Sequence, residues 1–180
     1  MEKNVEFGIN YIKFAPLAAN GVFPDFTAST AVSVDMIVVD SFTHTEEDNT
    51  FQEIEWEDIA QKLTLPGSMG KKTITFTSNN VSAEAYKFFK GYSDGTGDNA
   101  GYLVNDPNFD DSQNLAMQYV TLPVAQYDAF EHEFTPVLVT VKKTGNTGKN
   151  GLPALQFTCT FQPNFDAAGK SIPNHRYKTA

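Results

Sequence analysis

Several stretches of the chain alternate polar and apolar residues with a period of two. The clearest is Lys72–Ser78, in which Ile74 and Phe76 alternate with three threonines. A period of two places apolar side chains on one face of a β-strand, and β-branched and aromatic residues favour that conformation. The same pattern recurs in Phe7–Tyr11, Leu115–Tyr119, Ala129–Val141 and Leu155–Phe161. The sequence therefore predicts a mainly β protein.

Two of the expected strands carry further information. Ala31–Phe42 is predicted to be one strand, and its apolar run Met36–Val39 presents apolar side chains on both faces. We therefore expect its second half to be covered on both sides, by another sheet or another subunit. Pro136 cannot donate a backbone hydrogen bond, so it predicts an edge position or a bulge within Ala129–Val141.

One helix is expected between Lys72–Ser78 and Gly91. Asn80 or Ser82 can cap its first turn, and Gly91 is placed to end it. A helix of about three turns is marginal alone. Its apolar stripe is therefore expected to pack on a sheet through Ala85, Phe88 and Phe89.

Three segments are polar and rich in Gly or Pro, namely Gly91–Asn114, Lys142–Gly151 and Gln162–Ala180. We expect the first to be a loop that is mobile or ordered by a partner, the second a long hairpin tip and the third an extended arm. Such segments bury too little apolar surface to order themselves. The length of 180 residues suits one core. The expected fold is a single domain over residues 1–180, a β-sandwich or barrel with one short flanking α-helix, long loops and an extended C-terminal arm over 162–180.

Charge and hydropathy restrict the partners. The net charge is -9, so the surface repels phosphate and tight binding to nucleic acid is disfavoured. Met1–Phe14 lacks the apolar core of a secretory signal, and Met36–Val39 is far too short to span a bilayer. We expect a soluble protein with no membrane partner. Cys159 is the only cysteine, so no internal disulfide can form.

No motif indicates a cofactor or a metal. Gly95–Ala100 has the letters of a dinucleotide-binding turn, but a helix precedes it, and Asp94 and Asp98 would repel a pyrophosphate. His44, His132 and His175 are far apart in sequence, and Glu131–Glu133 is expected to be a solvated polar face. The aspartates of Gly91–Asn114 are the ligand type that calcium prefers, but they lack the regular spacing of an EF-hand loop. Calcium binding there stays open.

Catalytic residues are not apparent either. Cys159 lies in an apolar strand and is expected to be a small buried hydrophobe. No Gly-x-Ser-x-Gly elbow is present, and the carboxylates can be paired in too many ways to nominate a catalytic pair. Exposed Trp56 or Tyr102 could stack on a sugar or a base, although a core or subunit-contact role is favoured. We expect no enzymatic activity and no cofactor.

The order of these elements resembles that of the tail tube, or major tail, proteins of long-tailed bacteriophages. The resemblance spans roughly residues 5–165 and rests on an N-terminal strand, an acidic hairpin, KKTITFTS, SAEAYKFFKG, an Asp/Gly loop and the hairpin TPVLVTVKKTGNTGKNGLPALQFTCTF. The tube protein of bacterial type VI secretion is similar in architecture. Such proteins form hexameric rings whose strands join into an inner β-barrel, and stacked rings make a conduit for DNA.

The resemblance implies a structural protein of the virion tail, assembled in the cytoplasm of the bacterial host. Its partners would be copies of itself, other tail proteins, and DNA in transit without tight binding. If Phe51–Asp58 is a strand, Glu53, Glu55 and Glu57 share one face, and this acidic strip is expected to line the channel. Expected subunit contacts are Lys142, Lys143, Asn146, Lys149 and Phe165.

A second class of function stays open beside the tube. A monomeric β-sandwich binding module could recognise a glycan or another protein through its loops. A size measurement separates the two, because a tube protein forms rings or filaments and a binding module does not. An enzyme is the third hypothesis.

Overall fold

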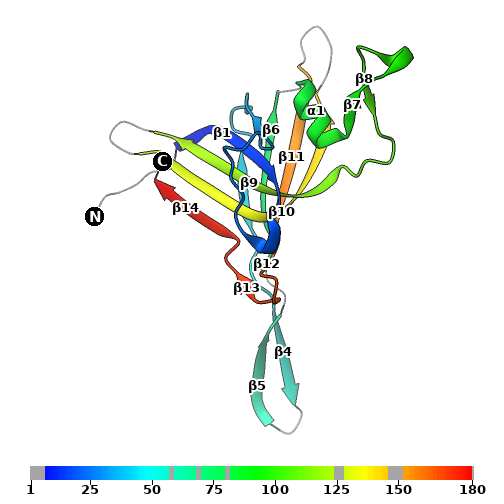
Figure 1. The fold of residues 1–180 in the computed structure, drawn as a ribbon. Helices are drawn as coiled ribbons and strands as arrows, with labels where there is room; N and C mark the ends of the chain where they lie inside the picture. Colours follow the sequence, from blue (N-terminus) through cyan, green and yellow to red (C-terminus); the bar gives the residue numbers. More distant parts are fainter. Residues whose placement is uncertain are drawn as a thin grey trace.

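One antiparallel sheet of eight strands forms the body of the protein (Figure 1). The computed structural model describes residues 7–56, 59–67, 70–79, 82–123, 128–145 and 152–179, without the side chains of residues 7 and 52–66. The strands follow the order β2-β1-β9-β10-β11-β6-β3, and β14 also pairs with β10. Their bounds are β1 Phe7–Pro16, β2 Val32–Val34, β3 Thr43–Glu46, β6 Lys72–Ser78, β9 Ser112–Leu122, β10 Phe130–Thr144, β11 Ala154–Phe161 and β14 His175–Thr179. The expected mainly β fold is confirmed.

The sheet curls until the chain that follows β2 reaches β6. Ile37 forms a β-bridge with Ser78, and the backbone N–H of Val38 donates to the carbonyl of Thr77 at 2.8 Å. Asn79 donates in the same way to the carbonyl of Met36 at 3.1 Å. These bonds close this part of the sheet into a barrel, in which alternate side chains face the interior.

The closing segment corrects one prediction. Regular pairing ends at Val34, and Met36 and Asp40 adopt left-handed backbone conformations with φ of 54° and 60°. The chain therefore turns twice where an unbroken strand over 31–42 was expected. Met36 is 67% exposed and Val39 is 84% exposed. The expectation that this segment is covered on both faces is wrong for the isolated chain.

Phenylalanine rings fill the barrel. Phe76 and Phe157 stack with their centroids 4.6 Å apart, and Phe14 lies 5.7 Å from Phe157. Phe89 meets the rings of Phe14 and Phe157 edge-on at 5.3 and 5.1 Å. All four rings are buried. Because stacked and edge-to-face pairs add to the gain from burial, this cluster contributes strongly to stability.

Helix α1, Ala83–Lys90, closes one end of the barrel, and its limits confirm the prediction. The backbone N–H of Ala85 donates to Ser82 Oγ at 3.2 Å, which caps the first turn. Gly91 ends the helix in the left-handed conformation. Ala85 and Phe89 are buried in the core, whereas Phe88 is partly buried against it.

A bulge at Pro136 divides β10 into two halves. The register against β9 shifts between Phe134 and Val137, so the predicted bulge is confirmed. Residues 130–134 of β10 pair with β14, and residues 137–144 pair with β11. The same side of β10 therefore carries two different strands, one after the other.

Among the described residues, three two-stranded ribbons lie outside this sheet. They are β4–β5 (Phe51–Trp56 and Ile59–Pro66), β7–β8 (Tyr92–Asp94 and Leu103–Asn105) and β12–β13 (Asn164–Phe165 and Ser171–Ile172). Figure 1 shows β4–β5 projecting from the body at the end away from α1, and β7–β8 projecting beside α1.

These ribbons correct the expectation that the polar segments cannot order themselves. Within residues 91–111, Gly95 donates to the carbonyl of Tyr102 at 2.8 Å and Asp106 donates to that of Gly91 at 3.1 Å. The segment thus pairs with itself. The C-terminal segment is extended, as expected, but β14 joins the main sheet and does not hang free.

Candidate functional site

An open groove of about 870 Å³ lies at the end of the barrel away from α1. The edge strand β3 borders it on one side and β14 on the other, because β14 leaves the barrel wall at the bulge of β10. Its walls carry apolar rings, amides and hydroxyls. The lining includes His44, Lys72, Tyr119, Phe134, Phe161 and His175. We call this cavity the open-end groove.

Aromatic and histidine rings form a stacked array along one wall of the groove. Phe161 stacks on Phe134 at 4.5 Å, and Phe134 stacks on His175 at 4.3 Å, with planes within 6°. Tyr119 stacks on His132 at 4.7 Å. Because these ring faces cover one another, the array leaves few faces free for a ligand to stack on.

Two of the histidines that are far apart in sequence meet in this array. His132 Nδ1 and His175 Nε2 lie 3.2 Å apart in a hydrogen bond. His44 lies on the other side of the groove, with its ring 5.8 Å from that of Phe161. No cluster of three metal-ligating side chains occurs among the residues that the structure describes.

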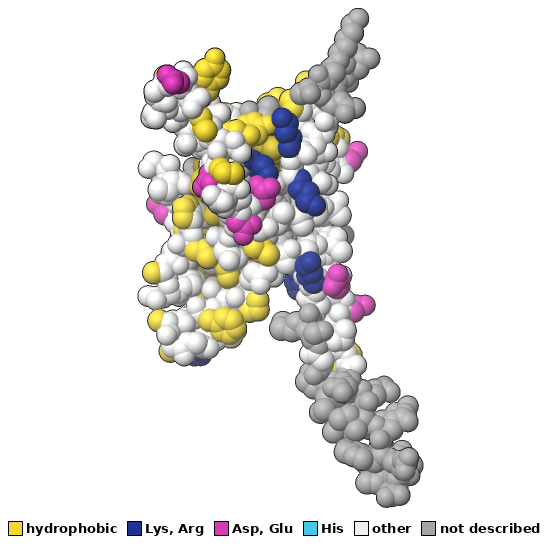
Figure 2. Space-filling view, turned by 90° about the vertical axis from the view of Figure 1, so that its right-hand side faces the viewer, with side chains coloured by type: hydrophobic (Ala, Val, Ile, Leu, Met, Phe, Trp, Pro, Cys, Tyr) yellow, Lys and Arg dark blue, Asp and Glu magenta, His cyan; other side chains and the backbone are white. Residues whose placement is uncertain are grey.

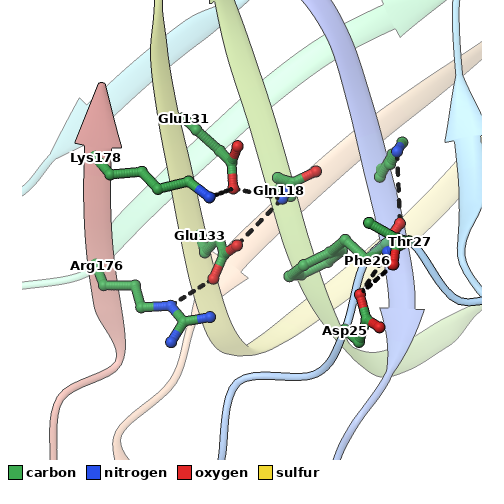
Figure 3. Close-up of polar contacts among 9 residues, drawn as sticks. Asp25, Phe26, Thr27, Gln118, Glu131, Glu133, Arg176 and Lys178 are labelled. Carbon is green, nitrogen blue, oxygen red and sulfur yellow. Dashed lines mark hydrogen bonds and ion pairs between the residues drawn. The ribbon is translucent and has the colours of Figure 1, made fainter. Parts of the chain in front are cut away.

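The opposite face of β10 carries a charged cluster, shown in Figure 3. Gln118 on β9 donates through Nε2 to Glu131 at 3.0 Å and to Glu133 at 3.1 Å. From β14, Lys178 pairs with Glu131 at 3.1 Å and Arg176 with Glu133 at 2.5 Å. The two carboxylate side chains are only 15% and 10% exposed. The expected solvated polar face is therefore wrong, because β14 covers it.

Alternation in the sequence could have indicated this pairing. Arg176 and Lys178 alternate with His175, Tyr177 and Thr179, as the two glutamates alternate on β10. Two cations facing two carboxylates across an antiparallel pair is a favourable arrangement. The signal was missed because the segment has no apolar alternation.

A loop covers the same outer face beside the charged cluster. Arg176 lies over the ring of Phe23 at 4.4 Å, and Phe26 packs with Ala15 and Ala116 in a small second core. The hydroxyl and the backbone N–H of Thr27 donate to Asp25 at 2.7 and 2.8 Å, which lowers the pKa of that exposed carboxyl.

The residues predicted to make assembly contacts are only partly visible. Glu53 and Glu55 lie in β4, but their side chains, with Glu57, are outside the described part of the chain, and so are Asn146 and Lys149. Lys142, Lys143 and Phe165 are exposed, Phe165 by 52%. The acidic strip and the subunit contacts stay predictions.

Most residues considered as a nucleophile or as calcium ligands are buried or already have partners within the chain. Cys159 is buried, as predicted, and burial raises the pKa of its thiol, so the thiolate needed of a nucleophile is disfavoured. In the 91–114 segment, Asp94 pairs with Lys87 at 2.7 Å and Asp111 with Lys90 at 2.6 Å. Asp110 accepts from the backbone N–H of Ser112. These contacts use carboxylate oxygens that a calcium ion would need.

The surface facing the viewer in Figure 2 mixes hydrophobic side chains with charges of both signs. Lysine and arginine do not form a continuous basic patch on this face, which agrees with the net charge of -9. Among the described residues, no helix has the length and the apolar run needed to cross a bilayer. Comparison with protein families and with curated proteins finds no match to this chain.

Proposed function

We propose that this protein is a structural subunit that assembles with copies of itself, and that the assembly is the tube of a bacteriophage tail. The observation that carries the proposal is the β4–β5 ribbon, Phe51–Trp56 with Ile59–Pro66, which pairs only with itself among the described strands. An isolated two-stranded ribbon is marginally stable in water. Its retention as a projection is therefore best explained by contact with another molecule.

The sheet edges support the same conclusion. Within the described chain, β3 pairs only with β6, and β14 pairs only with β10. Exposed strand edges promote association unless the sequence protects them. If the two edges meet head to tail between copies, the contact is heterologous, and a closed ring follows when the rotation between copies closes.

Exposed apolar side chains are also spread over the projections and loops. Val39, Phe51, Tyr102, Leu152, Phe165 and Tyr177 are each more than half exposed. Apolar side chains scattered singly are common on protein surfaces, so these residues are compatible with subunit contacts but do not indicate them by themselves. The acidic net charge suits a channel that must not retain DNA, because each basic contact to phosphate adds affinity.

The open-end groove is the observation that favours a monomeric binding module. A cavity lined by apolar rings and a few polar groups is the usual form of a ligand site. However, the stacked rings cover one another's faces, which disfavours a sugar that needs a free face. Within this alternative, a protein segment fits the groove better than a glycan does.

Size measurement tests the proposal directly. The purified chain should give rings or filaments by light scattering and negative-stain microscopy, more readily at high salt, where repulsion between copies with a charge of -9 is screened. A chain that stays monomeric at high concentration and high salt would refute self-assembly and leave the binding module.

Removal of the β4–β5 ribbon identifies its role. The backbone N–H of Gly67 donates to the carbonyl of Thr50 at 2.8 Å, so the two ends of the ribbon are adjacent. Residues 51–66 can therefore be replaced by an Asn-Gly turn without moving β3 or β6. We expect this variant to fold, with Cys159 still protected from thiol reagents, and to stay monomeric. Assembly as efficient as that of the intact chain would exclude the ribbon.

A further inference from the structure

The edge of β10 at residues 130–134 is a site built to hold a basic strand. Gln118 belongs to β9, and its amide holds both Glu131 and Glu133 from the body of the sheet (Figure 3). Two carboxylates brought together and mostly buried are unfavourable unless cations neutralise them. A strand at this edge therefore needs positive side chains at two positions separated by one residue.

Strand β14 meets that requirement and lies at the edge of the sheet. Arg176 and Lys178 supply the two cations, and the strand pairs with β10 over five residues. All five residues of β14 are exposed, and its outer edge has no partner among the described strands. Segments with little buried apolar surface open at low free energy. Detachment of β14 breaks its two ion pairs and the contacts of His175. No β14 residue belongs to the buried core, so the barrel core stays intact and the acidic site on β10 is freed.

We propose that β14 is exchanged between copies, so that in the assembly the acidic edge of β10 binds β14 of a second copy. The proposal rests on the self-assembly proposed above. Exchange of an identical element keeps every contact that the element makes within one chain, so its cost is small. The charge complementarity of Arg176 and Lys178 with Glu131 and Glu133 selects this strand over the other exposed edges, because β3 presents Thr43, His44, Thr45 and Glu46.

Cysteine cross-linking distinguishes exchange from pairing within one chain. Thr135 donates to the carbonyl of Asn174, so by alternation His132 and Tyr177 form a non-hydrogen-bonded pair, whose side chains lie closest. Chains with His132→Cys are mixed with chains with Tyr177→Cys and mildly oxidised. We expect a mixed-disulfide dimer on a non-reducing gel. The native Cys159 is buried and does not compete.

A matched control uses two strands of the body. Ser112 on β9 and Thr140 on β10 have hydroxyl oxygens 3.0 Å apart, and these strands do not exchange under the proposal. A mixture of Ser112→Cys and Thr140→Cys chains should give several-fold less dimer. The double variant His132→Cys/Tyr177→Cys, in dilute monomeric form, should form its disulfide within one chain, which establishes that the geometry permits the bond.

Charge reversal tests the recognition. Arg176→Glu/Lys178→Glu, added to the Tyr177→Cys chain, should lower the yield of mixed dimer by roughly tenfold, because two ion pairs become like-charge contacts. Glu131→Lys/Glu133→Lys in the His132→Cys partner should restore it. Rescue would not occur if these charges merely supported folding.

The outcomes separate the two proposals. Assemblies that form without mixed disulfide above the control overturn strand exchange and leave self-assembly standing. Mixed dimers without larger assemblies support exchange and overturn the tube. Monomers at every concentration, with disulfides only within chains, overturn both.

Discussion

The barrel and the projecting β4–β5 ribbon are made from the same kind of strand but are stabilised in different ways. In the barrel, the central strands pair on both sides and enclose three stacked phenylalanine rings and a fourth that meets them edge-on. The ribbon has one hydrogen-bonded ladder and belongs to no larger sheet of the described chain. Burial of apolar surface dominates folding stability. The comparison therefore separates a region stabilised by a shared apolar core from a ribbon that lies outside the main sheet.

Truncation inside the barrel should have the largest effect. Phe89 is fully buried between Phe14 and Phe157, so Phe89→Ala should lower the free energy of unfolding by about 3–5 kcal/mol. Phe88→Ala is the matched control on the same helix. Because Phe88 is only partly buried, its cost should be about half as large. Urea unfolding measures both, and equal costs would contradict the assignment of Phe89 to the core.

Gly91, which joins α1 to the β7–β8 ribbon, should show an intermediate effect. Its φ is +63°, and an added Cβ would lie 2.2 Å from the ring of Phe109. Gly97 also has a positive φ, but nothing lies within 4 Å of an added Cβ. Gly97→Ala should cost about 1–2 kcal/mol through backbone strain alone. Gly91→Ala should cost more by thermal unfolding, and equal costs would mean that Phe109 moves aside freely.

Truncation on β14 should have the smallest effect on overall stability. Tyr177 is 66% exposed, so Tyr177→Ala should change the free energy of unfolding by about 0.5 kcal/mol or less. In the monomer, the amides of β14 should also exchange with deuterium sooner than those of β9. Protection of β14 equal to that of β9 would place it with the barrel and remove the distinction between the two regions.

Local patterns in the sequence predicted most elements. They did not predict which strands far apart in the chain pair with one another. Alternation placed the central strands, and Ser82 with Gly91 fixed the helix. The closure of the barrel was missed because Met36 and Asp40 adopt left-handed conformations that glycine usually marks, so the segment reads as one strand. Turn glycines in 91–111 suggested a loop, although the backbone there pairs with itself.

The candidate functional surfaces were harder to predict than the core. The charged cluster depends on the register that places Arg176 opposite Glu133, and no single segment contains that information. The open-end groove arises where β10 changes partner at its bulge, so Pro136 indicated the irregularity but not the cavity that follows from it. The acidic strip expected at Glu53, Glu55 and Glu57 lies outside the described side chains and stays a prediction.

The pairing of β1 with β9 also determines when the barrel can form during synthesis. Ile12 pairs with Tyr119, about a hundred residues later in the chain, and such distant contacts make folding slow. On the ribosome, Ile12 and Phe14 therefore wait for a time on the order of ten seconds before their partner strand is made. During that interval their apolar side chains are open to chaperones and to neighbouring nascent chains. Slower translation between β1 and β9 should lengthen this exposure and lower the yield of native protein.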